Sequence, residues 1–160
     1  MYIWKTGSLS MDIKNDSVQD KDWMKYFLWV SILMVLGMYI TMLSPRSNLT
    51  AMAVEAIAVI GITIFGVSIT YDTNRKGGGT GVNYIARFTA LSLPILIKLF
   101  VLSVIFGIIL VVVNQVASLT PDDQEWAFAI FTIVVQALYF WRINSHLKIV
   151  GSSFDQSAQE

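Results

Sequence analysis

The stretch that decides the fold of this chain runs from Arg87 to Gln115 and reads RFTALSLPILIKLFVLSVIFGIILVVVNQ. From residue 99 to residue 113 it contains no ionisable side chain, and Ser103 is the one strongly polar residue there. An apolar run of this length is typical of a helix that crosses a lipid bilayer. The sequence therefore predicts an integral membrane protein.

The composition of the whole chain agrees with this prediction. Of its 160 residues, 55% are hydrophobic and 14% are charged, and the mean hydropathy is +0.62. Soluble domains carry about 25% charged residues, so a soluble domain of this size could not cover so much apolar surface. We expect a single domain that lies in the membrane, with lipid solvating part of its apolar surface.

The composition also argues against several classes of function. The net charge is zero, whereas a nucleic-acid-binding protein needs a basic surplus for its phosphate contacts, so we expect no nucleic-acid partner. There is no Cys and only one His, which excludes thiolate nucleophiles, Cys-based metal sites and a His cluster. We predict membrane lipids as partners and no cofactor or metal.

Three further apolar runs complete a set of four spans. Turn and cap signals separate them, because Pro45 disfavours helix at Ser44, while Thr120 can cap a helix whose first position Pro121 takes. We predict an all-α integral membrane fold, a four-transmembrane-helix bundle. The predicted spans are residues 23–43, 51–71, 93–114 and 124–142.

The segments outside the spans are mostly polar. We interpret residues 1–22 as a polar N-terminal tail without fixed structure, residues 23–150 as the membrane domain, and residues 151–160 as a C-terminal tail. The Gly-rich segment 72–81 indicates a flexible loop. Residues 83–92 form an amphipathic lead-in to the third span, lying partly in the membrane interface.

The distribution of cations predicts the orientation of the bundle. Nine Lys and Arg residues lie in the N-terminal tail and first turn, around the Gly-rich loop, or just beyond the fourth span, whereas the other two loops hold only Arg46. By the positive-inside rule, the tails and the Gly-rich loop face the cytoplasm and the two short loops face outward. We predict a bacterial inner-membrane protein with both termini cytoplasmic.

Lys98 is the one charge deep in the third span, and three interpretations of it stay open. Its long stem can carry the ammonium back to the cytoplasmic interface, it can bond another helix, or it can serve conduction or a ligand. Arg87, Leu91, Pro94 and Lys98 share one helix stripe, which could line a cytoplasmic vestibule or a lipid-headgroup groove. Pro94 is expected to kink the helix.

Glu55 is the acidic residue of the second span. It lies roughly on one side with Ala51, Ala58 and Gly61, a small-residue side that we expect to pack against protein. A Glu55–Lys98 pair is rejected, because the rise of a helix places the two residues near opposite leaflets. The favoured partners of Glu55 are Arg46 or the amides at the start of its own helix.

Other polar residues of the membrane region have a structural interpretation. Thr132, Gln136 and Tyr139 fall along one side of the fourth span and are expected to join helices by hydrogen bonds. In the Gly-rich loop, Arg75 and Lys76 precede the glycines, which is the wrong order for a phosphate-binding loop. We expect a hinge there, or a contact with anionic lipid or a partner protein.

The residues at the end of the fourth span give no catalytic signature. Arg142 precedes His146 by one helical turn, but no acid is placed to orient the imidazole and no nucleophile is signalled. We interpret both residues as interfacial or partner-contacting, and we predict that the protein is not an enzyme.

Three functions are compatible with this architecture. The first is an oligomerising membrane subunit, a homo-oligomer that scaffolds or signals to a cytoplasmic protein partner; membrane subunits of bacterial defence or toxin-immunity systems have this general size and plan. The second is a small channel or transporter, although the first span lacks the embedded acid of small multidrug exporters. The third is a holin-like protein that disrupts the membrane.

Overall fold

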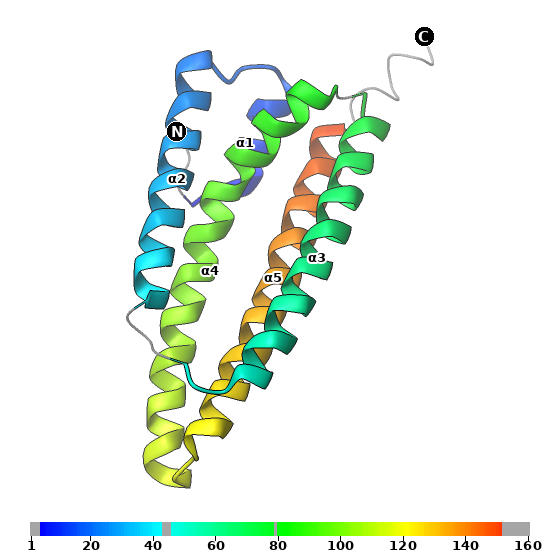
Figure 1. Cartoon of the computed structure of the whole chain (residues 1–160). Helices are drawn as coiled ribbons and strands as arrows, with labels where there is room; N and C mark the ends of the chain where they lie inside the picture. Colours follow the sequence, from blue (N-terminus) through cyan, green and yellow to red (C-terminus); the bar gives the residue numbers. More distant parts are fainter. Residues whose placement is uncertain (1–3, 43–45, 79, 152–160) are drawn as a thin grey trace.

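The computed structural model describes residues 4–42, 46–78 and 80–151, and this part of the chain is helical without a strand (Figure 1). The predicted all-α class is therefore confirmed for the described residues. The five helices are α1 (Thr6–Lys14), α2 (Asp20–Met42), α3 (Leu49–Lys76), α4 (Gly81–Ala117) and α5 (Pro121–Gly151).

Three of these helices, α3, α4 and α5, are long and apolar enough to cross a membrane. Each contains one predicted span, and their exposed surfaces are rich in large apolar side chains. The protein is therefore a membrane protein by the length and composition of these helices. Helix α2 contains residues 23–42 of the first predicted span, whose last residue lies outside the described part of the chain, and its crossing of the membrane stays a prediction.

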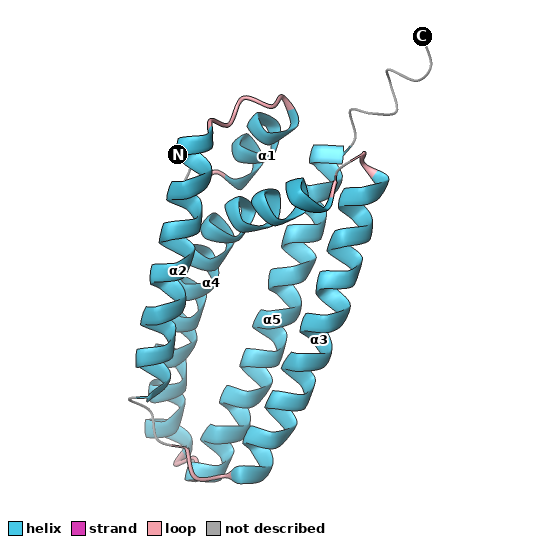
Figure 2. Ribbon diagram, turned by 45° about the horizontal axis from the view of Figure 1, so that its top comes forward, coloured by secondary structure: helices cyan, strands magenta, loops and turns pink. Residues whose placement is uncertain are grey.

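Helices α3 and α5 run side by side and parallel to each other (Figures 1 and 2). The amide of Gln136 donates a hydrogen bond of 2.9 Å to the Thr63 hydroxyl. Further along both helices, the Thr73 hydroxyl donates one of 2.6 Å to the Asn144 side chain. The helices therefore keep one register over several turns.

The remaining helices extend this pair on one side. Helix α2 packs along α4, and the short helix α1 lies across α4 and α5 at one end of the bundle (Figure 2). We call this the α1 end; it comprises α1 with residues 20–33, 66–77, 80–98 and 139–151. The distal half comprises residues 46–62 and 100–135.

The buried core lies at the α1 end. Its apolar cluster takes residues from α1, from the first turns of α2 and α4, and from the last turns of α5. Leu9 and Ile13 of α1 share this cluster with Ile143 and Leu147 of α5. Helix α1 is thus part of the packed structure.

Helix α1 corrects the expectation that residues 1–22 form a tail without fixed structure. Thr6, Leu9, Ser10 and Ile13 are all buried and share one face of the helix. Their spacing of three and four residues is that of an amphipathic helix. The charged residues in and beside this segment, Lys5, Asp12 and Lys14, hid this pattern in the sequence.

Helix α4 continues without a break through Pro94, which lies inside it and is fully buried. Figure 2 shows that α4 bends along its length, as expected of a helix in which proline removes a backbone donor. The interfacial lead-in predicted for residues 83–92 is wrong in its last turn, because Ala90, Leu91 and Ser92 are buried in the core.

The predicted cap of α5 is confirmed. The Thr120 hydroxyl accepts a hydrogen bond of 3.2 Å from the Asp123 N–H, and the Asp123 carboxylate accepts one of 3.1 Å from the Thr120 N–H. Pro121 is the first residue of the helix, where its missing N–H costs nothing. This local signal was readable because it involves neighbours in sequence only.

The Gly-rich loop is shorter and more constrained than predicted. Helix α3 ends at Lys76 and α4 begins at Gly81. Gly77 is buried against Gly151, since a Cβ built on Gly77 would lie 2.4 Å from the Gly151 Cα. Of the predicted C-terminal tail, Gly151 belongs to α5 and residues 152–160 lie outside the described part of the chain.

Candidate functional site

A pocket of about 270 Å³ lies between α1, α4 and α5. Three cationic or titratable side chains line it: Lys98 from α4, and Arg142 and His146 from α5. The sequence had singled out all three separately, and the fold brings them together. This cationic pocket is the candidate functional site of the molecule.

Lys98 reaches from α4 to the N-terminal segment. Its ammonium donates a hydrogen bond of 3.0 Å to the Thr6 hydroxyl and lies 5.8 Å from the ring centre of Trp4. The distance to the ring permits a cation–π contact. Lys98 thus directs its charge to the α1 end and bonds another helix. That it snorkels to a membrane interface stays a prediction.

His146 is half-buried in the same pocket, with its Nδ1 3.1 Å from the Ser10 hydroxyl of α1. This pair is not the start of a catalytic dyad. Ser10 is fully buried, its hydroxyl donates to the Thr6 carbonyl at 2.9 Å, and the charges near the imidazole are cations. Buried hydroxyls of this kind hold helices together.

The electrostatics of the pocket are positive. His146 lies beyond the predicted fourth span; burial lowers the pKa of its imidazole, and the charges of Lys98 and Arg142 lower it further. Arg142 is exposed and stacks 5.1 Å from the Trp141 ring. Among the described residues, no carboxylate lies within ion-pair distance of Lys98 or Arg142.

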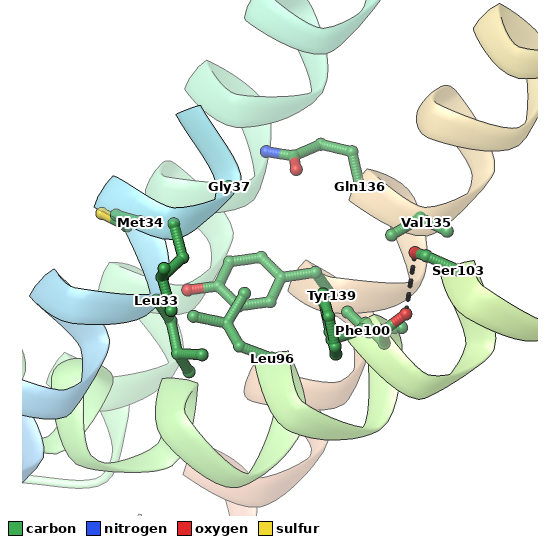
Figure 3. Close-up of a pocket in the computed structure, with 11 residues that line it drawn as sticks. Leu33, Met34, Gly37, Leu96, Phe100, Ser103, Val135, Gln136 and Tyr139 are labelled. Carbon is green, nitrogen blue, oxygen red and sulfur yellow. Dashed lines mark hydrogen bonds between the residues drawn. The ribbon is translucent and has the colours of Figure 1, made fainter. Parts of the chain in front are cut away.

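A second cavity, of about 470 Å³, lies between α2, α4 and α5 and is mostly apolar. In Figure 3, Leu33 and Met34 of α2 line one side of this cavity, and Val135 of α5 and Ser103 of α4 line the other. The ring of Tyr139 lies between the two sides (Figure 3). The Ser103 hydroxyl donates to a carbonyl of its own helix at 2.9 Å. The cavity therefore offers few free polar groups to a solute.

The polar residues predicted to join helices do so in two cases of three. Gln136 bonds Thr63 of α3, as described above, and the Tyr139 hydroxyl lies 2.7 Å from that of Ser92 on α4. The Thr132 hydroxyl instead donates to the Phe128 carbonyl within α5 at 3.0 Å.

Arg75 and Lys76, the cations before the Gly-rich loop, are both exposed at the end of α3. Lys76 lines a shallow pocket together with Lys148, between the last turns of α3 and α5. Neither residue contributes to the cationic pocket. Their predicted contact with lipid or a partner stays a prediction.

The vestibule or headgroup groove predicted along the stripe of Arg87, Leu91, Pro94 and Lys98 is wrong. Leu91 and Pro94 fill the middle of this stripe and are fully buried. The Arg87 guanidinium turns to α3, where it donates a hydrogen bond of 3.0 Å to the Asn74 side chain. Of this stripe, Lys98 lines the cationic pocket.

Glu55 forms an ion pair with Arg46, which is the partner that the sequence favoured. The small-residue side of α3 is only partly as predicted: Ala51 is buried, but Gly61 is exposed. At about 100° per residue, Gly61 lies about 80° away from Ala51 around the helix. The contact with α5 is made instead by Gly66, where a Cβ would lie 2.2 Å from the Phe140 Cγ.

Sequence reasoning missed the contribution of α1 to the site. Thr6 and Ser10 bond Lys98 and His146 across more than ninety residues of chain. The signal that could have found them is the amphipathic spacing of Thr6, Leu9, Ser10 and Ile13.

Comparison of the chain with known protein families, with curated proteins and with solved structures finds no match. The function is therefore argued from the residues and their arrangement.

Proposed function

We propose that this chain is a non-enzymatic, oligomerising subunit of a bacterial inner membrane that holds or signals to a cytoplasmic protein partner. In this proposal α2 to α5 form a four-helix membrane bundle with both termini in the cytoplasm. A defence or toxin-immunity system is one setting for such a subunit. The α1 end would then carry the polar surface that a cytoplasmic partner meets.

The observation that carries the proposal is an exposed face of α3. Ile57, Ile60 and Ile64 stand 74%, 60% and 65% exposed along it. Gly61 lies among them, and a Cβ built there would meet nothing within 4 Å. A glycine lets the backbones of two helices approach closely inside lipid, and the large side chains around it then pack against the partner helix, so this face suits a second copy of the chain.

The alternation of the helices supports the membrane orientation. The ends of α3 and α5 and the beginnings of α2 and α4 gather at the α1 end, together with most of the cations. A cytoplasmic location of this end agrees with the positive-inside rule. A reporter fused after Glu160 should be active in the cytoplasm, and activity only on the far side of the membrane would refute the orientation.

The oligomer is tested by size measurement of the purified protein in mild detergent, together with cross-linking in membranes. The Gly61→Leu variant should shift the population from oligomer to monomer, because the side chain holds the helices apart. Gly107→Leu is the matched control, since Gly107 on α4 also has open space around its Cβ. A wild-type protein that is monomeric and captures no partner would refute the proposal.

The apolar cavity between α2, α4 and α5 favours a small transporter of an apolar solute as the second candidate. Its volume of about 470 Å³ is in the range of small-molecule sites. Solute flux into liposomes that disappears in a Leu99→Trp variant, which fills the cavity wall, would establish it. Growth arrest with loss of membrane potential on expression would instead indicate the holin-like function.

A further inference from the structure

We infer that the cationic pocket between α1, α4 and α5 binds the phosphate headgroup of an acidic phospholipid from the leaflet at the α1 end. The inference rests on the membrane architecture of the proposed function but not on its oligomer or partner. It concerns Lys98, Arg142 and His146 and the apolar side chains that continue the pocket away from the α1 end.

The first argument is the uncompensated charge. Lys98 uses one of its three N–H donors on Thr6. The Arg142 guanidinium stacks on Trp141 and donates no hydrogen bond to a described residue. With no carboxylate of the described part of the chain within ion-pair distance, the pocket holds free donors that match the oxygens of a phosphate.

The second argument is the order of side chains along the pocket. On α4, which runs away from the α1 end, Leu102 follows Lys98 by four residues, or about 6 Å of rise. On α5, which runs toward the α1 end, Leu138 precedes His146 by eight residues, or about 12 Å. Both helices therefore place the cations of the pocket nearer the α1 end than Leu102 and Leu138.

This order selects a lipid over a free anion. A soluble phosphate would leave the exposed surface of Leu102 and Leu138 in the pocket without apolar contact, whereas an acyl chain covers it. The aromatic side chains of Trp4 and Trp141 lie next to Lys98 and Arg142, the two cations of the pocket. Tryptophan prefers the headgroup region of a bilayer, and basic pockets between helices at this level bind anionic headgroups.

The test uses the full-length protein, purified in neutral detergent without any partner, and native mass spectrometry to titrate bound lipid. Phosphatidylglycerol should bind more tightly than phosphatidylcholine. The Lys98→Gln, Arg142→Gln double variant should lose this preference by about 10-fold or more, because each cation near a membrane surface contributes about a factor of five. The matched control is Arg75→Gln, Lys76→Gln, which removes the same charge at the same end outside the pocket.

Two further arms keep the result interpretable. If loss of the Lys98–Thr6 bond unfolds the double variant, Arg142→Gln alone should still lower the preference, while Arg142→Lys should retain most of it. Millimolar inorganic phosphate should not displace the lipid. The inference is overturned if phosphatidylglycerol shows no preference, if both double variants lose it equally, or if inorganic phosphate displaces the lipid and binds the wild type alone.

The outcome is independent of the oligomer and the partner. A monomeric protein that captures no partner but retains phosphatidylglycerol at Lys98 and Arg142 would leave this inference standing while removing the proposed function. An oligomer without lipid preference would do the reverse.

Discussion

The α1 end and the distal half of this molecule are built from similar apolar helices but are stabilised differently. At the α1 end, side chains such as Leu91 and Ile143 are fully buried, and hydroxyl, amide and guanidinium groups bond across helices. In the distal half, Ile108 and Val112 are more than half exposed. The first region is completed by its own chain, whereas the second depends on its surroundings for apolar contact.

The comparison is tested most strongly by deleting core volume in each region. Leu147→Ala at the α1 end, where Leu147 is 1% exposed, should lower the free energy of unfolding by about 3 kcal/mol, because it leaves a cavity. Ile108→Ala in the distal half, where Ile108 is 61% exposed, should lower it by less than about 0.5 kcal/mol. Reversible unfolding in mixed micelles, followed by circular dichroism, measures both. Equal losses would show that the two regions are packed alike.

The next effect concerns the seam between α3 and α5. Gly66→Leu should cost about 2–3 kcal/mol of unfolding free energy, since the new side chain overlaps Phe140 and the helices must separate. Gly107→Leu on α4 meets open space and serves as the control. Thermal unfolding of the purified variants in detergent reports the difference. A Gly66→Leu protein as stable as the control would contradict the close approach of α3 and α5.

A smaller effect is expected from a single buried hydroxyl. Tyr139→Phe removes the hydrogen bond to Ser92 and should cost about 1–1.5 kcal/mol. Tyr71→Phe is the same chemical change on a more exposed ring, which contacts Tyr84 edge to face, and should be nearly neutral. The same detergent unfolding experiment compares the two variants. Identical melting behaviour would argue that the Tyr139–Ser92 bond does not stabilise the α1 end.

The smallest effect is expected at the distal end. Glu55→Gln removes the ion pair with Arg46, whose two side chains are 14% and 26% exposed, and should cost about 1 kcal/mol. Asp22→Asn breaks the more exposed pair with Lys25 and should leave the unfolding midpoint unchanged. Unfolding of both variants beside the wild type in detergent measures the two losses. A loss for Asp22→Asn as large as that for Glu55→Gln would contradict this ranking.

The sequence predicted those features that depend on a single helix or on neighbouring residues. The length of each apolar run placed the long helices, because the requirement of a span is a length of apolar chain. The cap at Thr120 is formed within four residues. The Arg46–Glu55 pair was also accessible, since the two residues are separated by only one turn and the start of one helix.

The features that were missed arise from contacts between remote segments. The composition of α1 favours a helix only weakly. Leu9 and Ile13 become core residues because the beginning of α4 and the end of α5 pack beside them. The cationic pocket likewise depends on where α5 meets α4, which the periodicity of neither helix specifies. The contact between α3 and α5 is made at Gly66 and not at Gly61. The sequence of α3 alone could not distinguish the two, since either glycine would allow a close helix contact.

The parallel pairing of α3 and α5 has a consequence for biosynthesis. The Thr63 hydroxyl of α3 accepts a hydrogen bond from Gln136 of α5, a residue synthesised 73 positions later. Helix α3 therefore enters the membrane before its partner helix α5 has been made. Until α5 is synthesised, the face of α3 that will contact α5 is covered by lipid, by α4 or by an insertion factor. The bundle therefore completes its packing late in translation. A ribosome that stalls before α5 leaves a membrane protein in which the face of α3 that packs against α5 is still uncovered.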